Sequence, residues 1–330
     1  MNLITEVGNT YKNEIAIRLR RMAYSIRPLK TNYIPMKLDN PLIKKSLLLF
    51  LLSTSTVVFA QEKMEVETPP PAPSNEPIKS TFENGVLINN QTAQGLSKNS
   101  LDFIIQHRFG LVKDHEDLYG LFAPSNIRFG LNYGVTKSLS VGAGVTKNKR
   151  LYDFQWKYII LKQTSPGGMP VTVTYFGNVT NSALPEANFN NQENKYKATD
   201  RLFYFNEIMV ARKFSSHFSM QVAVTQAHVN IVDPLMRHDV YGVSLAGKYK
   251  FSPQSSVLVE FDNPLTVHAI NKQTSNLGVG YELSTGSHQF QIFISTADAI
   301  NNSQILMYNQ NDFTKKQFLI GFNIMRQWGF

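Results

Sequence analysis

The chain has 330 residues, a formal net charge of +9, no Cys, 14 Tyr and 22 Phe. This length allows one large β-domain or two smaller ones. The absence of Cys excludes disulfides, thiolate metal sites, cysteine nucleophiles and the lipidated cysteine of a bacterial lipoprotein.

The first recognisable element is a secretory signal over residues 36–60. Three lysines precede the apolar run 46–59, which is followed by Ala60. Charge, apolar core and a small residue at the exit, in this order, are typical of a signal peptide. The apolar run of about 14 residues is shorter than the roughly 20 that a membrane-crossing helix needs. We therefore expect cleavage after Ala60.

Residues 1–35 lie upstream of this signal, which begins properly at Met36. We interpret them as an extension that results from a mis-assigned start. Residues 1–60 hold nine of the 33 Lys and Arg and three of the 24 Asp and Glu, so the mature part keeps 24 basic and 21 acidic residues. Its net charge of +3 gives no reason to expect a nucleic-acid partner.

Residues 61–80 contain the Pro- and Glu-rich stretch EKMEVETPPPAPSNEP. Such a stretch cannot bury enough apolar surface to fold, so we expect a disordered periplasmic linker. A Pro-rich ligand for a partner protein is the alternative. Residues 81–99 follow as a segment that leads into the folded domain, either as a plug or as a periplasmic stretch.

From residue 100 onward, apolar and polar residues alternate with a period of two, which predicts β-strands. In SLDFIIQHRF, for example, apolar side chains alternate with Asp, Gln and Arg. The segments 202–214 and 218–229 follow the pattern less cleanly, because Asn206 and Arg212 interrupt the better register. The count is about 12 strands, an even number typical of single-chain outer-membrane barrels.

The lengths of the connections distinguish a membrane barrel from a soluble sandwich. Short links such as GVTKS, SSH, SPQ and TGS follow the even strands, whereas long ones follow most odd strands, as at residues 110–124, 178–200 and 296–316. Short periplasmic turns and long outer loops are the pattern of outer-membrane barrels. The expected fold is therefore an all-β, transmembrane antiparallel up-and-down β-barrel over residues 100–330, with both termini in the periplasm.

Aromatic residues at the ends of the even strands support a position in a bilayer. Tyr and Trp at a membrane interface form the girdle that holds a barrel in place. We expect these side chains near the periplasmic rim, in contact with outer-membrane lipid. The candidate interface aromatics are Tyr133, Tyr158, Phe214, Phe251, Trp328 and Phe330.

Several segments carry a family resemblance, among them TFENGVLINNQT at Thr81, APSNIRFGLNYGVT at Ala123 and FLIGFNIMRQW at Phe318. From about Thr81 to the C-terminus the chain resembles a β-barrel family of Gram-negative outer membranes whose function is undefined. The resemblance implies the barrel and its location, and it carries no catalytic residues. The terminal Phe330 is similar to the signal that barrel-assembly machinery reads, so we expect this machinery as a partner during insertion.

Charged residues on the inward side of the strands form the candidate lumen site. Both signs occur, so they either lock together as struts that plug a narrow barrel or line a polar path. A barrel of about 12 strands lies between filled and open barrels, so its size does not decide. We expect Lys248 and Lys250 to cluster with Glu260 and Asp262 on the next strand. The inward charges are Asp102, Arg108, Arg128, Asp153, Lys157, Lys248, Lys250, Glu260, Asp262 and Glu282.

Other chemical sites have less support. His228, Asp233, His238 and His268 could meet on the outer loops, but their spacing is not that of a metal motif, so we expect no metal and no cofactor. An outer-membrane phospholipase needs a lipid-facing Ser beside a His, and no such Ser is identifiable near His107. We therefore expect no enzymatic activity.

The sequence predicts a passive channel or small-solute transporter in the outer membrane of a Gram-negative bacterium. The main alternative is a non-transporting barrel that binds or scaffolds an envelope partner, and a phospholipase ranks third. The transported solute does not follow from the residues.

Overall fold

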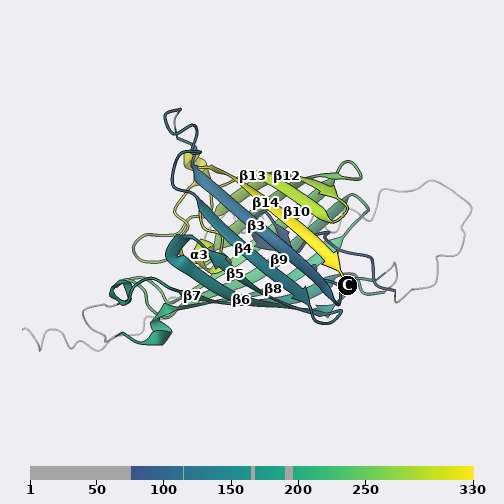
Figure 1. The fold of residues 1–330 in the computed structure, drawn as a ribbon, viewed down its shortest axis with the longest axis horizontal. Helices are drawn as coiled ribbons and strands as arrows, with labels where there is room; N and C mark the ends of the chain where they lie inside the picture. The colour runs from purple at the N-terminus through teal and green to yellow at the C-terminus, as the bar shows by residue number, and fades with distance from the viewer. Residues whose placement is uncertain (1–75, 114, 165–167, 190–195) are drawn as a thin grey trace, which may run out of the picture. The chain divides into compact units, whose positions relative to one another are not determined.

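The computed structural model describes residues 76–113, 115–164, 168–189 and 196–330. The expected extension 1–35, the signal 36–60 with its cleavage site at Ala60 and most of the linker 61–80 lie outside the described residues. Within the described part, twelve strands form one closed barrel (Figure 1). No helix of these residues is both long and apolar enough to cross a membrane.

The prediction of a 12-stranded, antiparallel, up-and-down barrel is confirmed. Each strand pairs with its neighbours in the chain, and β14 closes the ring on β3, where Ile324 lies opposite Ile105. The barrel strands are β3 (Ser100–Leu111), β4 (Asn126–Gly134), β5 (Leu139–Thr146), β6 (Leu151–Leu161), β7 (Thr172–Ser182), β8 (Leu202–Lys213), β9 (Phe218–Val229), β10 (Asp239–Lys250), β11 (Ser255–Pro264), β12 (Asn276–Thr285), β13 (His288–Ser295) and β14 (Leu319–Gly329).

The remaining elements are short and lie outside the barrel ladder. A hairpin of β1 (Val86–Leu87) and β2 (Asn90–Gln91) precedes the first barrel strand. The helix α3 (Asn302–Tyr308) belongs to the connection between β13 and β14. The 3-10 turns are η1 (Asn148–Arg150), η2 (Glu186–Asn188), η3 (Ala198–Arg201) and η4 (Phe313–Lys315).

The alternation along each strand separates a polar inner face from an apolar outer face. In β6, Asp153, Gln155 and Lys157 are buried, whereas Tyr152 and Phe154 are more than half exposed. Such a large exposed apolar surface is unusual for a water-soluble protein and typical of a barrel that meets lipid. Outward apolar side chains on other strands include Leu131, Val145, Ile208, Val224, Val243, Ile292 and Ile294.

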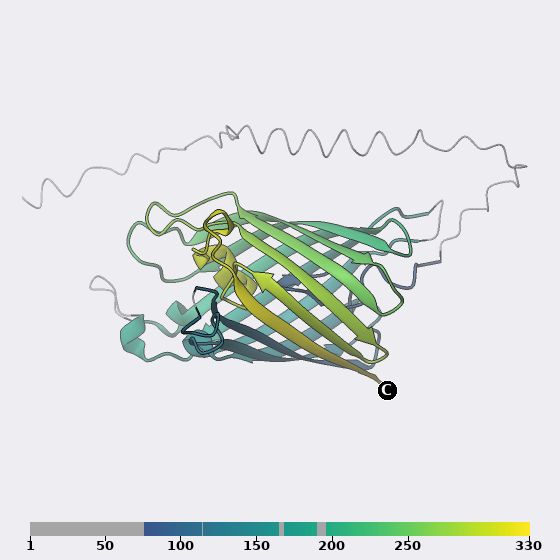
Figure 2. The ribbon, with the colours of Figure 1, turned by 90° about the horizontal axis from the view of Figure 1, so that it is seen from above.

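The two ends of the barrel differ in their connections. The short-turn rim carries the links 135–138, 162–171, 214–217, 251–254 and 286–287, and the C-terminus lies there (Figures 1 and 2). The long-loop rim carries the links 112–125, 147–150, 183–201, 230–238, 265–275 and 296–318. The lengths agree with the sequence pattern for most links; 147–150 is a short link on the long-loop rim, and 162–171 is a longer link on the short-turn rim.

Candidate functional site

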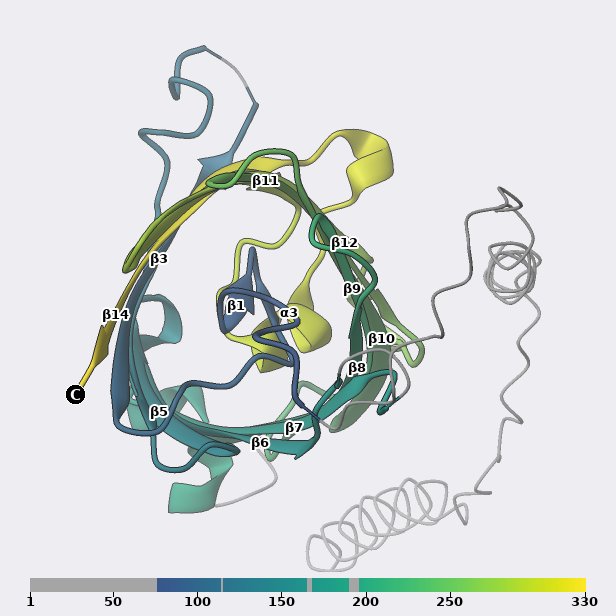
Figure 3. The ribbon, with the colours of Figure 1, turned by 90° about the vertical axis from the view of Figure 1, so that its right-hand side faces the viewer.

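The lumen of the barrel is occupied by the chain's own N-terminal segment. Residues 81–94, called the plug below, enter from the short-turn rim, where the backbone N–H of Ile78 donates to Gln163 at 2.9 Å. Figure 3 shows the hairpin strand β1 inside the ring of barrel strands. Plug residues hydrogen-bond to side chains from strands on opposite sides of the ring, such as Lys157 of β6 and Glu282 of β12. A segment bonded on all sides in this way must lie within the lumen.

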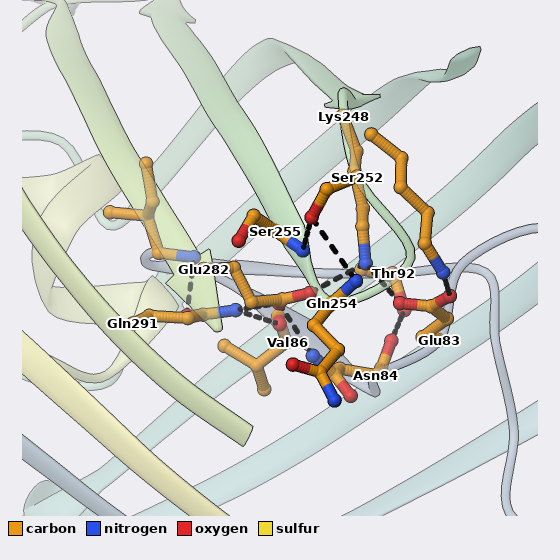
Figure 4. A network of polar contacts seen from close by, with 12 residues as sticks. Glu83, Asn84, Val86, Thr92, Lys248, Ser252, Gln254, Ser255, Glu282 and Gln291 are labelled. Carbon is orange, nitrogen blue, oxygen red and sulfur yellow. Dashed lines mark hydrogen bonds and ion pairs between the residues drawn. The ribbon is translucent and has the colours of Figure 1, made fainter. Parts of the chain in front are cut away.

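An ionic cluster joins the base of the plug to the wall (Figure 4). Lys248 donates to Glu83 of the plug at 2.7 Å and to Glu282 of β12 at 2.5 Å. Lys250 donates to the other oxygen of Glu83 at 2.5 Å. Burial raises the pKa of Glu83, but its hydrogen bonds and charge interactions with both lysines outweigh this, and the pKa lies below the ordinary value of 4.5. The plug base is therefore held by charge.

The tip of the plug hairpin binds a buried carboxylate. Glu260 accepts hydrogen bonds from the backbone N–H groups of Asn89 and Asn90, at 2.9 and 3.1 Å, and from the Asn89 side chain at 2.5 Å. Asn90 also donates to Asp262 at 2.8 Å. These bonds satisfy carboxylates that would otherwise lose their hydration without replacement.

Arg108 holds the same tip from the other side of the lumen. Its fully buried guanidinium donates to the side-chain oxygen of Asn89 at 2.8 Å and to the carbonyl of Ile88 at 3.1 Å. Ile88 has a φ of 55°, a left-handed conformation that is disfavoured for a β-branched residue. Such a conformation persists only where the surroundings impose it, so the wall determines the shape of the hairpin tip.

An apolar cluster supplements the polar contacts of the plug. Phe82, Leu87 and Ile88 belong to one buried cluster with inward residues of β7, β8 and β13, including Phe176 and Phe205. The inner face of β8 is therefore mostly apolar and carries one buried charged residue, Glu207, whereas Asn206 and Arg212 point outward.

This arrangement explains the irregular pattern of β8 in the sequence. The strand alternates as its neighbours do, but its apolar side chains meet the plug. On the outer face, Asn206 accepts a hydrogen bond from Tyr175 at 2.7 Å and donates to Gln226 at 2.9 Å. These partners satisfy an amide that faces away from the lumen.

Helix α3 enters the lumen from the long-loop rim and meets the plug (Figure 3). It packs on β8, β9, β10 and β11, and its residues from Ser303 to Met307 are buried. Asn302 donates to the carbonyl of Asn89 at 3.2 Å. Gly242 permits the approach of the helix, since a Cβ there would lie 2.7 Å from Leu306. A segment from each rim thus fills the lumen, and the two are in contact.

A second charged cluster lies on the opposite wall. Arg128 donates two bonds to Asp153, at 2.6 and 2.9 Å, and a third to Gln106 at 3.1 Å. Lys157 donates to two plug carbonyls, those of Gly85 at 2.9 Å and Gln94 at 3.2 Å. The wall on this side therefore supplies both a strut between strands and a further attachment of the plug.

The structure places all ten sequence-predicted lumen charges on the inward side. Lys250 and Asp262 are partly exposed, and the other eight are buried. Among these eight, Asp102 accepts a hydrogen bond from Asn132 at 3.3 Å. The expected cluster of Lys248 and Lys250 with Glu260 and Asp262 is wrong. The register pairs Lys248 with Leu258 and Ala246 with Glu260, which moves the carboxylates along the strand toward the plug tip.

The six candidate interface aromatics lie at or beside the short-turn rim. Tyr133, Tyr158, Phe214 and Phe251 are between 40% and 56% exposed, and the terminal Phe330 is 83% exposed. Trp328 is partly covered by Arg326, whose guanidinium lies 4.8 Å from the ring centroid. Their outward position is suitable for a lipid interface.

The histidines do not assemble into a metal site. His268 is buried and bonds to the carbonyl of Met307 at 2.9 Å, while His228 bonds to Asp239 at 2.9 Å. In the part of the chain that the structure describes, no group of three or more metal-binding side chains has a suitable arrangement. His107 stacks on Phe322, with ring centroids 5.0 Å apart.

The cavities that border the plug are small. One of about 30 Å³ lies beside Gly85, Asp102 and Lys157, and one of about 20 Å³ lies between Asn90 and α3. Each has room for about one water molecule. Neither cavity has room for a molecule much larger than water.

Sequence reasoning missed the plug contacts of Glu83, Asn89 and Asn90 and the insertion of α3. Strands β1 and β2 have two residues each, too few for periodicity to reveal. The Asn-rich stretch LINNQT was the one available signal, because Asn both donates and accepts hydrogen bonds.

The family to which the chain is similar agrees with the fold. A family model described as membrane bound beta barrel domain (DUF5777) matches residues 82–328. A KdgM porin is 7% identical, covering 70% of this chain and 99% of its own, with a TM-score of 0.41. A NanC porin is 8% identical, covering 70% and 100%, with a TM-score of 0.43.

An outer membrane channel from Pseudomonas putida F1 is 8% identical, covering 72% of this chain and 98% of its own, with a TM-score of 0.41. These similarities are too distant to carry an argument about the activity of this chain. No curated protein matches the sequence.

Proposed function

Since the chain belongs to the family of membrane bound beta barrel domains (DUF5777), we propose that it is an outer-membrane channel for small polar solutes, held closed by its own plug. Residues 1–60 are removed during export in this proposal, and the short-turn rim faces the periplasm. The barrel has no enzymatic role, and its outer face contacts outer-membrane lipid after insertion by the barrel-assembly machinery.

The way in which the plug is attached is the observation that carries this proposal. The plug contributes no strand to the barrel ladder and is held by separate polar bonds to the wall, at Glu83, Asn89 and Asn90 among others. Each of these bonds can be exchanged for water without breaking the barrel. The wall groups left behind, such as Arg108 and Glu260, would then line a hydrated path.

Energetics favour a removable plug over a permanent filling. Buried charges cost free energy even when they are paired, and apolar replacements of a buried ion pair are often as stable or more stable. A lumen that never opens could therefore be filled by apolar side chains. The polar attachment of the plug is suitable for a closed state that can open, because water can replace each hydrogen bond between the plug and the wall.

A reversible cross-link at the hairpin tip tests the proposal. Asn90 donates to Ser244 at 2.9 Å, and the chain has no native Cys, so Asn90→Cys with Ser244→Cys creates a unique pair. In planar bilayers we expect rare, discrete openings from the unmodified protein and from the reduced pair. Oxidation should abolish the openings, and reductant should restore them.

The single variant Ser244→Cys, treated with the same oxidant, is the matched control and should keep its openings. Gel mobility checks that the disulfide has formed. Openings that persist in the oxidised pair would place the conducting path away from the plug. Currents that stay at background in every reduced sample would instead favour the scaffold function.

A further inference from the structure

Two adjoining cavities lie at the long-loop rim. The larger holds about 580 Å³ and the smaller about 140 Å³. Asn126, Asn148, Lys149 and Asp298 line both cavities, so the two are separated by no more than these side chains. The smaller cavity ends against Gln304 of α3. The smaller cavity is therefore bordered by the helix that contacts the plug.

Lys149 directs its charge into the smaller cavity. Its Nζ donates to Oε1 of Gln304 at 2.7 Å and lies 4.1 Å from the ring centroid of Tyr308. Burial lowers the pKa of Lys149 below its ordinary value, although the charges of Asp298 and Asp233 oppose this shift. A partly desolvated ammonium group interacts more strongly with an anion than an exposed one does.

Gln304 leaves a hydrogen-bond donor without a partner beside this ammonium. The residue is 4% exposed, and its amide Nε2 has no hydrogen-bond partner, while its Oε1 is engaged by Lys149. The neighbouring Asn301 is satisfied, since it accepts from Thr146 at 2.9 Å and donates to Asp153 at 3.4 Å. A buried donor without an acceptor costs free energy, so an acceptor in the cavity would stabilise the site.

We propose that the smaller cavity binds the oxyanion group of a small solute between Nζ of Lys149 and Nε2 of Gln304. Lys149 and Gln304 both line this cavity, and one nitrogen donor from each side chain matches the oxygens of a carboxylate or phosphate. The larger cavity forms the approach, because four cationic residues line it and only two carboxylates do. The cationic residues are Lys113, Lys147, Lys149 and Arg150, and the carboxylates are those of Asp117 and Asp298. This excess of positive charge raises the local concentration of anions.

A bound anion would touch α3, and Asn302 of α3 donates to Asn89 at the plug tip. Binding of an anion at this site would therefore alter the contact between α3 and the plug. This effect on the lumen rests on the proposed function, whereas the binding of the anion does not. The two can fail separately, because one is measured as heat of binding and the other as current.

Isothermal titration calorimetry on the full mature chain in detergent tests the site with succinate and with inorganic phosphate. Succinamide, which has nearly the size of succinate and no charge, is the ligand control. We expect saturable binding of at least one anion and none of succinamide. Lys149→Gln and Gln304→Glu should each weaken binding by about tenfold or more, since the first removes the positive charge and the second removes the amide donor.

Lys272→Gln is the matched control variant, because Lys272 is an exposed lysine of the long-loop rim that lines neither cavity. It should bind the anion as the unmodified chain does. Heat-modifiable mobility on a gel checks that each variant is folded. If Lys149→Gln does not fold, Gln304→Glu decides, because it retains Lys149.

Three outcomes would overturn the proposal. One is the absence of saturable binding with both anions. Another is binding that Gln304→Glu leaves unchanged. The third is binding to anionic lipid micelles without any response to the soluble anions, which would assign the cationic residues to a membrane headgroup.

Discussion

Replacement of Lys248 by Met is expected to destabilise the barrel far more than the same replacement of Lys250. Both lysines point into the lumen from β10 and donate to Glu83. Lys248 alone also pairs with Glu282, and the exposed fractions of these two side chains are 7% and 2%. The Lys250 side chain is 24% exposed. The two variants therefore compare a buried ion pair with a hydrated one on the same strand.

The magnitude follows from what remains at Glu282. Loss of one partner of a buried ion pair costs about 3 to 5 kcal/mol of stability. Glu282 keeps hydrogen bonds from Asn84 at 2.6 Å and from Gln291 at 2.8 Å. We therefore expect Lys248→Met to cost about 3 kcal/mol, at the lower end of this range. A solvated pair contributes about 0 to 1 kcal/mol, which sets the expected cost of Lys250→Met.

Urea unfolding of the barrel in lipid vesicles, followed by the fluorescence of the two Trp residues, measures these differences. The double variant Lys248→Met with Glu282→Gln should recover most of the lost stability, because no unpaired charge stays buried. Equal losses in the two single lysine variants would refute the reasoning. So would a double variant whose loss equals the sum of its single losses.

Three further predictions concern the plug, α3 and the orientation of the chain. Folding lowers the pKa of Glu83, so at any pH above 4.5 its ionised carboxylate stabilises the attachment of the plug. This stabilisation is lost as the pH falls through the lower pKa of the folded state, and bilayer openings should become more frequent there. A Glu83→Gln variant that showed the same increase would contradict the assignment. Gly242→Val should displace α3 from the wall, since a Cβ would lie 2.7 Å from Leu306. A protease added to intact cells should then cut residues 296–318 faster than in the unmodified protein. Equal rates would argue against close packing of α3 on β10. An impermeant maleimide should label Lys272→Cys but not Gln254→Cys on intact cells, and the reverse result would invert the proposed orientation.

Strand existence, strand number and the assignment of inward and outward faces followed from the sequence. Alternation is a local property, because successive side chains of a strand point to opposite faces whatever the strand pairs with. The inward position of Arg108, Lys157 and Glu282 could be predicted for this reason. The connection lengths then separated the two rims.

Contacts across the lumen did not follow from the sequence. Lys248 and Glu260 both point inward as expected, but the pairing register of β10 and β11 sets them apart. Periodicity does not determine register to a single residue pair, because a shift of two residues preserves every face.

The closed lumen was decided only by the tertiary structure. Asn89 meets Glu260 across 171 positions of the chain and meets Asn302 of α3 across 213. A hairpin with two residues in each strand and a helix of seven have no stable form of their own in water. Their conformations depend on the polar and apolar groups of the wall, and those groups surround them only after β14 has paired with β3 and closed the ring.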